Sequence, residues 1–394
     1  MRILLIVDSY LPEPKATGPL FQSLSHELAR RGHEVTVLTV TNQTGADCSI
    51  AEESGIRVIR VRGPKLKGIP LARRAINEFL LSRTVWSRAA RAIAPLQAEI
   101  VAFYSPTIFW GPLIEKLKRI WNCRAVLILR DIFPQWALDA GQIRQGPHYW
   151  LLQRYAELQY KLADRIGIQS PRNAEFFHAR FPQYVPKLGV LFNWVEDADS
   201  SKAEDPRAAL AIASDIPVLL YGGNLGSAQD PDLLLECARA FSRGTTPNAF
   251  LLVIGEGSAT ERLTRSIRQE RLANIAFWPS VPQSRFLAIA RACDAGVIAL
   301  NRSLTTYNFP GKLLTYISAG LPVLASVNRG NDLRGIVESA NAGLCNWADL
   351  PSDFIENAER MAGNPRLREQ LSGNVRLRLR QTFSVGRAGD FVLG

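Results

Sequence analysis

Short hydrophobic runs alternate along this chain with segments of helical periodicity, and this alternation constrains the fold more than any other feature. Each run is four to seven residues long, the length of one strand. Apolar runs that alternate with helices are typical of βαβ units, so the pattern predicts parallel sheets covered by helices. The expected strands are Ile3–Val7, Val35–Val40, Arg57–Val61, Ile100–Phe103, Ala125–Leu129, Arg165–Gln169 and Leu188–Leu191 in the first half, and Val218–Tyr221, Phe250–Ile254, Asn274–Phe277, Gly296–Leu300 and Pro322–Ala325 in the second.

A polar stretch without periodicity divides the 394 residues into two halves of domain size. We expect an N-terminal Rossmann-like domain at 1–192, a linker at 193–205 and a second Rossmann-like domain at 206–380. Its last part, Phe354 through Arg380, is expected to be helical. A tail helix at 381–394 can cross back to the first domain.

Composition excludes several classes of protein. No apolar run reaches the length of a membrane span, and Met1–Val7 leads directly into Asp8, which favours a first strand over a signal peptide. The five cysteines are scattered without a C-x-x-C pair, which favours reduced thiols in the cytoplasm. The dispersed histidines suggest no metal site, and Asp197-Ala198-Asp199 is interpreted as a solvated loop.

The net charge of +11 belongs entirely to the first half of the chain. Residues 1–192 hold 26 Lys and Arg against 15 Asp and Glu, whereas residues 193–394 hold 21 of each. Ten basic residues and one acid lie between Arg57 and Arg91, interleaved with apolar residues. We expect this segment to dock on the anionic inner face of the cytoplasmic membrane, although a solvated basic face is the alternative. The expected contacts are Lys65, Lys67, Arg73, Arg74 and Arg83.

The segment from Phe309 to Ala325 predicts a helix with clear end signals. Pro310 suits a first helical turn, and Gly320 followed by Pro322 is a stop signal. Lys312 lies in the first turn, where a cation is unfavourable to the helix dipole unless an anion binds there. The alternative is a solvated Lys on an ordinary crossover helix.

Glycine-bearing loops follow several of the expected strands. Tyr221–Gln229 carries three glycines, Gly255-Glu256-Gly257 carries two, and the first loop ends at Gly18. Glycines between a strand and a helix let the backbone approach a diphosphate, but the G-x-G-x-x-G spacing of a dinucleotide site is absent. Arg130 and Asp131 also follow a buried strand, as either a working pair or a structural one.

These segments together resemble glycosyltransferase family 4, whose members are retaining enzymes of the GT-B fold. Phe309–Ala325 resembles the family's donor-site segment, Tyr221–Gln229 resembles its G-R-L-x-x-x-K loop, and Arg130-Asp131 stands where the family often has His-Asp. By pattern, the chain is similar to bacterial surface-polysaccharide enzymes for O-antigen or capsule. The resemblance implies an α/β chain of two Rossmann-like domains with parallel sheets facing across a cleft. It implies catalytic roles for Arg130 and Asp131, and donor contacts at Gly18, Gly222, Gly223, Asn224, Gln229, Gly255, Glu256, Pro279, Val281, Phe309, Pro310, Gly311, Lys312 and Thr315.

Two departures from the family pattern affect donor recognition. The family's paired glutamates fall on Tyr307 and Thr315, and the Arg and Lys that grip the donor diphosphate fall on Asn224 and Gln229. Lys312 is then the remaining cation for that charge.

The resemblance implies a metal-independent transferase without a cofactor. Its co-substrate would be a nucleotide sugar, in our interpretation UDP-linked. The acceptor would be a lipid-linked saccharide of the undecaprenyl-diphosphate type or a lipopolysaccharide core, and no nucleic acid is involved. The alternatives are a non-enzymatic GT-B scaffold or partner subunit, and another GT-B-like enzyme such as a nucleotide-sugar epimerase or a phosphorylase. The sequence gives no indication of the oligomeric state.

Overall fold

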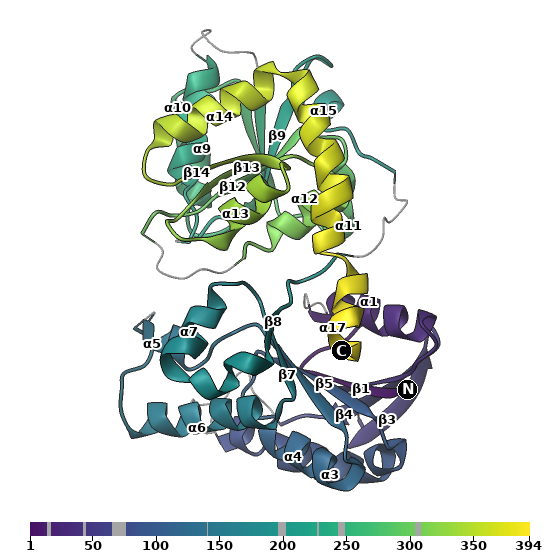
Figure 1. Cartoon of the computed structure of the whole chain (residues 1–394). Coiled ribbons are helices and arrows are strands. Elements are labelled where there is room, and N and C mark those ends of the chain that lie inside the picture. Colours follow the sequence, from purple (N-terminus) through teal and green to yellow (C-terminus); the bar gives the residue numbers. More distant parts are fainter. Residues whose placement is uncertain are drawn as a thin grey trace. The chain divides into compact units, whose positions relative to one another are not determined.

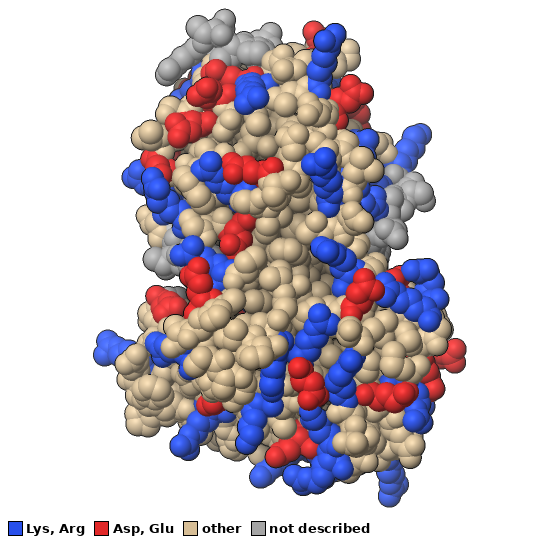
Figure 2. Space-filling view, viewed as in Figure 1, with Lys and Arg blue, Asp and Glu red and all other residues tan. Residues whose placement is uncertain are grey.

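The computed structural model describes residues 1–13, 17–41, 45–64, 76–139, 141–195, 202–226, 228–242, 249–303 and 309–394. The chain forms two compact units: unit 1 comprises Met1–Trp194 with Val385–Gly394, and unit 2 comprises Val195–Ser384. Each unit is a sheet flanked by helices (Figure 1), which confirms the predicted pair of α/β domains. Lys and Arg are prominent on the surface of unit 1 (Figure 2).

The sheet of unit 1 has eight strands in the order β3-β4-β2-β1-β5-β6-β7-β8. β3 pairs with β4 in the antiparallel sense, so the prediction of a wholly parallel sheet is wrong at this edge. β3 was not expected because its sequence is polar and largely exposed. The strands are β1 (Arg2–Val7), β2 (Glu34–Thr41), β3 (Cys48–Glu53), β4 (Ile56–Arg62), β5 (Ile100–Ser105), β6 (Arg124–Leu129), β7 (Arg165–Ile168) and β8 (Leu188–Val190).

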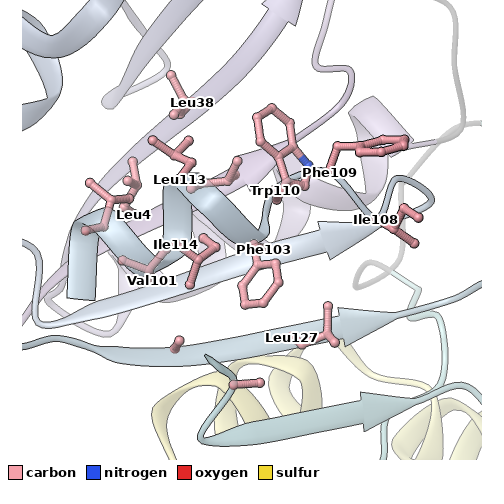
Figure 3. Packing of buried hydrophobic residues seen from close by; sticks show 14 of the residues in the cluster. Leu4, Leu38, Val101, Phe103, Ile108, Phe109, Trp110, Leu113, Ile114 and Leu127 are labelled. Atoms are coloured by element: carbon pink, nitrogen blue, oxygen red, sulfur yellow. The ribbon is translucent and has the colours of Figure 1, made fainter. Parts of the chain in front are cut away.

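Helices cover both faces of this sheet. One face packs against α3 (Leu81–Ile93), α4 (Gly111–Trp121) and α6 (Pro147–Leu162), and Figure 3 shows part of that core. The other face packs against α1 (Thr17–Arg30) and α17 (Val385–Leu393), the last helix of the chain. Arg31 fixes α17 through an ion pair with Asp390 at 2.6 Å.

Unit 2 contains a parallel sheet of six strands in the order β11-β10-β9-β12-β13-β14. Its strands are β9 (Val218–Asn224), β10 (Phe250–Glu256), β11 (Ile275–Pro279), β12 (Ala295–Ala299), β13 (Val323–Val327) and β14 (Gly343–Trp347), of which only β14 was not expected. α9 (Pro231–Ser242), α10 (Thr260–Gln269) and α14 (Pro351–Gly363) pack on one face. α11 (Gln283–Ala290), α12 (Lys312–Ala319) and α13 (Asp332–Ser339) cover the other (Figure 1).

The segment from Phe354 through Arg380 is helical, as predicted, and is divided into several helices. α14 ends at Gly363, and Asn364 then caps α15 (Pro365–Asn374) by accepting a hydrogen bond from the N–H of Leu367. Asn and Pro at this junction are a helix stop and a new start. In the described part of the chain, no helix combines the length and apolar character that crossing a membrane requires.

The strand order of unit 2 places its switch point beside β9. The chain runs from β9 outward through β10 to β11, and then returns to build β12, β13 and β14 on the other side. In open α/β sheets, ligands bind at the carboxyl ends of the strands where the order reverses. The carboxyl ends of β9 and β12 are therefore where a ligand site is expected.

Candidate functional site

The carboxyl end of β9 is formed by Gly222, Gly223 and Asn224. Gly223 has φ +107°, a backbone conformation that favours glycine, and both Gly223 and Asn224 are exposed at the sheet edge. A Cβ on Gly222 would lie 1.9 Å from Cζ of Phe286, so that position is small because of packing within the unit. Gly223 is thus the position where the backbone itself is open to a ligand.

Lys312 is the first residue of α12 and reaches the same sheet edge. The predicted stop signal is confirmed, because Gly320 closes the helix with φ +74°. The predicted start is wrong by two residues: Gly311 is the N-cap, so Pro310 precedes the first turn. The Lys312 Nζ donates to Oε1 of Gln229 at 2.8 Å and lies 3.6 Å from the centre of the Tyr221 ring. Burial lowers the pKa of Lys312 from its ordinary 10.5 to about 7, because the charged form loses hydration.

Two buried tyrosines, which the sequence analysis did not single out, position this edge. The Tyr221 hydroxyl donates to Asn224 O at 2.9 Å and contacts Oε1 of Gln229 at 3.2 Å. The Tyr316 hydroxyl accepts from the N–H of Gly222 at 3.1 Å, one helical turn from Lys312. Burial raises the pKa of both hydroxyls. The two-residue period of a strand puts Tyr221 on the face of Gly223, so its proximity was readable from the sequence.

Three adjacent strands present predicted donor residues in one row. Strand register pairs Gly223 with Gly255 and Gly255 with Pro279, and Glu256 pairs with Asn224 one position further. A Cβ on Gly255 would lie 1.9 Å from the carbonyl oxygen of Gly223, so the two strand ends meet closely. Adjacent strands are about 4.8 Å apart, so the row spans about 10 Å from β9 to β11.

A cavity of about 370 Å³ lies next to the end of β11. The predicted residues Pro279 and Val281 line it, together with Trp278 and Arg285. Arg285 is held by an ion pair with Glu204 at 2.8 Å, so its charge is already balanced. An indole and a proline offer apolar surface to a planar group.

The remaining donor residues lie at the start of α12. Phe309 and Pro310 are half-buried and Gly311 is exposed. Thr315, at one of the family's glutamate positions, is buried, and its Oγ1 accepts from Nε2 of Gln283 at 3.0 Å. A neutral Gln–Thr pair therefore stands where the family has a carboxylate. Tyr307, at the other glutamate position, is outside the described residues.

The close approach at Gly255 gives a testable expectation. Gly255→Ala should destabilise the protein by about 3 kcal/mol, because a methyl group must displace the backbone of Gly223. The matched change Gly335→Ala lies on α13, where a Cβ would meet nothing within 4 Å, and should stabilise by about 0.5–1 kcal/mol. Urea unfolding of the two variants measures both effects, and equal stability of the two would refute the packing argument.

The predicted catalytic pair of unit 1 has two different environments. The Arg130 guanidinium is buried, donates to Leu191 O at 2.8 Å and lies 5.8 Å from the centre of the Trp194 ring. Burial lowers the pKa of Arg130 to about 10. Asp131 is exposed, at the carboxyl end of β6. Arg130 is thus positioned to hold the backbone after β8, whereas Asp131 is available to a substrate.

Gly18 lies in the first turn of α1 and is buried. A Cβ there would lie 3.2 Å from the backbone nitrogen of Leu11, so the loop after β1 packs directly against this turn. Close packing therefore requires a glycine at Gly18 in unit 1, as it does at Gly222 and Gly255 in unit 2. Its predicted donor contact stays a prediction.

The predicted membrane segment is only partly within the described residues. Lys65, Lys67, Arg73 and Arg74 lie outside them, while Arg83 is exposed on α3. Acidic residues from β3 and the loop before it form ion pairs with basic residues of this segment and so neutralise part of its positive charge. The pairs are Arg60–Glu53, Arg62–Asp47 and Arg88–Asp47.

The two α/β units have the GT-B fold, as predicted. The structure is similar to sucrose-phosphate synthase from Thermosynechococcus elongatus, with TM-score 0.69, 16% identity and coverage of 99% of this chain and 96% of that chain. It is also similar to Anabaena HepE in complex with UDP and glucose, with TM-score 0.63, 14% identity and coverage of 100% and 98%.

Family comparison then makes the assignment specific. Residues 17–188 match the family described as "Glycosyl transferase 4-like domain", and residues 202–378 match "Glycosyl transferases group 1". The chain therefore belongs to the family 4-like glycosyltransferases. A curated relative, "Putative colanic acid biosynthesis glycosyl transferase WcaI" of Escherichia coli (strain K12), is 24% identical over 338 residues, which are 81% of this chain and 82% of that protein.

Proposed function

We propose that this protein is a retaining glycosyltransferase that takes its sugar from a nucleoside diphosphate donor, in our proposal UDP-linked, bound on unit 2. The observation that carries the proposal is Lys312 beside Gly223 at the switch point of the sheet. A flexible cation and an exposed backbone fit a diphosphate. HepE, a structural relative, is recorded with UDP and glucose, which supports the choice of nucleotide.

The row of strand ends from β9 to β11 then gives proposed positions for the ribose and the base of the donor. With the diphosphate at Gly223, the ribose lies over the end of β10, where the exposed Glu256 carboxylate can accept hydrogen bonds from the ribose hydroxyl groups. The base extends toward Trp278, Pro279 and Val281. Thr315 and Gln283 take the place of the family carboxylate by offering neutral hydrogen bonds to sugar hydroxyls.

In the proposed reaction, the bond between the donor's anomeric carbon and its β-phosphate oxygen breaks, and the acceptor hydroxyl oxygen bonds to that carbon from the same face. The acceptor proton passes to the departing phosphate oxygen. Lys312 and the backbone N–H groups stabilise the charge that develops on the diphosphate, so no metal is invoked. Within the described residues, no three His, Cys, Asp or Glu side chains are grouped to hold a metal ion.

The proposed acceptor is a lipid-linked saccharide of the undecaprenyl-diphosphate type or a lipopolysaccharide core, in bacterial polysaccharide synthesis. The name of WcaI supports this pathway class. The basic excess of unit 1 supports a peripheral position on the inner face of the cytoplasmic membrane, with the segment from Arg57 to Arg91 as one contact.

Calorimetric titration with UDP, GDP and ADP tests the donor part of the proposal. We expect UDP to bind with a dissociation constant in the micromolar range, about 8 kcal/mol, and at least tenfold more tightly than the other two. Binding of none of the three would favour the non-enzymatic scaffold. Binding of UDP, together with epimerisation of an added UDP-sugar and no transfer to any lipid-diphosphate acceptor, would favour an epimerase.

A further inference from the structure

The outward face of α6 is unusual for a surface helix. Two adjacent residues near its N-terminal end, Trp150 and Leu151, are 54% and 51% exposed, and Pro147 and His148 before them are also exposed positions. The next two exposed residues of α6 are basic, Arg154 and Lys161. The outward stripe of a surface helix is normally polar throughout, so two large apolar side chains in its first turns are unexpected.

The apolar surface continues beyond α6. Phe79 is 41% exposed, and its ring lies 5.1 Å from that of Tyr155, which is one turn from Leu151 on the same helix. Ile76, one turn before Phe79, is 59% exposed. We call Ile76, Phe79, Trp150 and Leu151 the α6 patch.

Basic residues outnumber acidic ones around the patch, in which the half-buried Glu78 lies between Ile76 and Phe79. Between residues 144 and 161, the exposed charged side chains are Arg144, Arg154 and Lys161, all basic. The one carboxylate in this stretch, Glu157, is half-buried and accepts a hydrogen bond from the Tyr184 hydroxyl at 3.2 Å. Figure 2 shows a largely uncharged area over α5 (Gln135–Asp139) and the start of α6, with side chains of both charge signs beside it.

A hollow lies directly beside the exposed tryptophan. Its volume is about 670 Å³, and Trp150, Leu151, Arg154, Glu157, Arg180 and Phe181 are among the residues that line it. Its two guanidinium groups outnumber its one carboxylate, and together with the indole they suit a phosphate at the level where apolar and aqueous surroundings meet.

We propose that the α6 patch inserts into the interfacial layer of an anionic lipid bilayer. Trp150 and Leu151 enter the boundary between headgroups and acyl chains, and Arg154 and Arg180 bind lipid phosphates. The basic rim favours a lipid surface of negative charge over a neutral apolar partner. This inference rests on the proposed lipid-linked acceptor, and it adds an apolar contact to the electrostatic one at Arg57–Arg91.

Co-sedimentation of the full chain with vesicles tests the proposal. The vesicles contain phosphatidylcholine alone or with phosphatidylglycerol. We expect binding to the anionic vesicles, a loss of at least tenfold in partitioning for Trp150→Ser with Leu151→Ser, and a loss of about fivefold for Arg154→Gln. The matched control is Leu377→Ser with Arg378→Gln, which removes an exposed Leu and an exposed Arg from unit 2 and should bind as the wild type does.

Three results would overturn the proposal. They are wild-type binding by the patch variant, equal loss in the control variant, and a stable dimer of the wild type that the patch variant abolishes. Titration of the same variants with UDP separates this inference from the proposed donor site. If the protein binds vesicles through the patch but does not bind UDP, the membrane contact stands and the proposed donor site is wrong. If the protein binds UDP but the patch variant binds vesicles as the wild type does, the donor site stands and the membrane contact is wrong.

Discussion

Replacement of Lys312 by alanine is expected to weaken UDP binding about 10- to 150-fold, or about 1.5–3 kcal/mol, the range of a charge-assisted hydrogen bond. Lys312 is the cation that the structure places beside Gly223, and Gln229 and Tyr221 hold its Nζ without neutralising it. The matched control is Lys202→Ala, an exposed lysine of the same unit. If calorimetry gives the Lys312 variant the same affinity for UDP as the wild type, Lys312 does not bind the donor diphosphate.

The lowered pKa of Lys312 adds a pH dependence to that result. Free protein loses the Lys312 proton near pH 7, whereas a bound diphosphate raises this pKa. UDP affinity of the wild type should therefore fall as pH rises above about 7, by up to about tenfold per pH unit, and binding at pH 8 should take up a proton. Without nucleotide, the unfolded chain binds more protons between pH 7 and 10.5, so this group makes stability rise with pH across that window. Titrations in buffers of different ionisation enthalpy measure the uptake, which Lys312→Ala should abolish.

Asp131→Asn is expected to lower turnover by about 100-fold or more while the melting temperature changes by less than about 2 °C. The expectation rests on exposure: the Asp131 carboxylate is at a strand end and available to a substrate, in the way that a group acting on an acceptor must be. Release of UDP from the donor, measured with a lipid-diphosphate acceptor, gives the turnover. UDP affinity should stay at the wild-type value, because the donor site lies on unit 2.

The neighbouring residue supplies the contrast. Arg130→Ala should lower the melting temperature, since it removes a buried guanidinium that binds the carbonyl of Leu191. Asp139→Asn, an exposed carboxylate of the same unit, is the control for a generic charge effect. A collapse of the melting temperature in Asp131→Asn would assign Asp131 a structural role, and equal turnover of both Asn variants would remove its catalytic role.

α12 and the strands other than β3 and β14 could be predicted because their signals are local. Apolar runs of strand length and the Gly320 stop signal need no tertiary information. β3 was not predicted because its polar sequence lacks an apolar run and is also typical of a loop. Ser54 and Gly55, both with positive φ, form the two-residue turn to β4, and that dipeptide was a hairpin signal.

The partners of the site residues were harder to predict. Lys312 was singled out from its place in the helix, but its contact with Gln229 joins residues 83 positions apart. The pair Gln283–Thr315 has no sequence signal, because a neutral pair that replaces a carboxylate leaves no charge pattern to read. Arg130 was predicted to contact a substrate because functional residues often lie at strand ends. Its burial under the backbone after β8 depends on tertiary packing, which the sequence pattern does not show.

The path of the chain through unit 1 has a consequence for how the protein is made. Unit 2 is one continuous stretch, Val195–Ser384, whereas unit 1 is complete only when α17 is added from residues 385–394. Phe391 and Val392 of α17 are buried in the core that covers one face of the first sheet. On the ribosome, unit 1 thus begins before unit 2 and is finished after it: the part of its sheet that α17 covers stays exposed until residues 385–394 are synthesised, by which time all of unit 2 has been made.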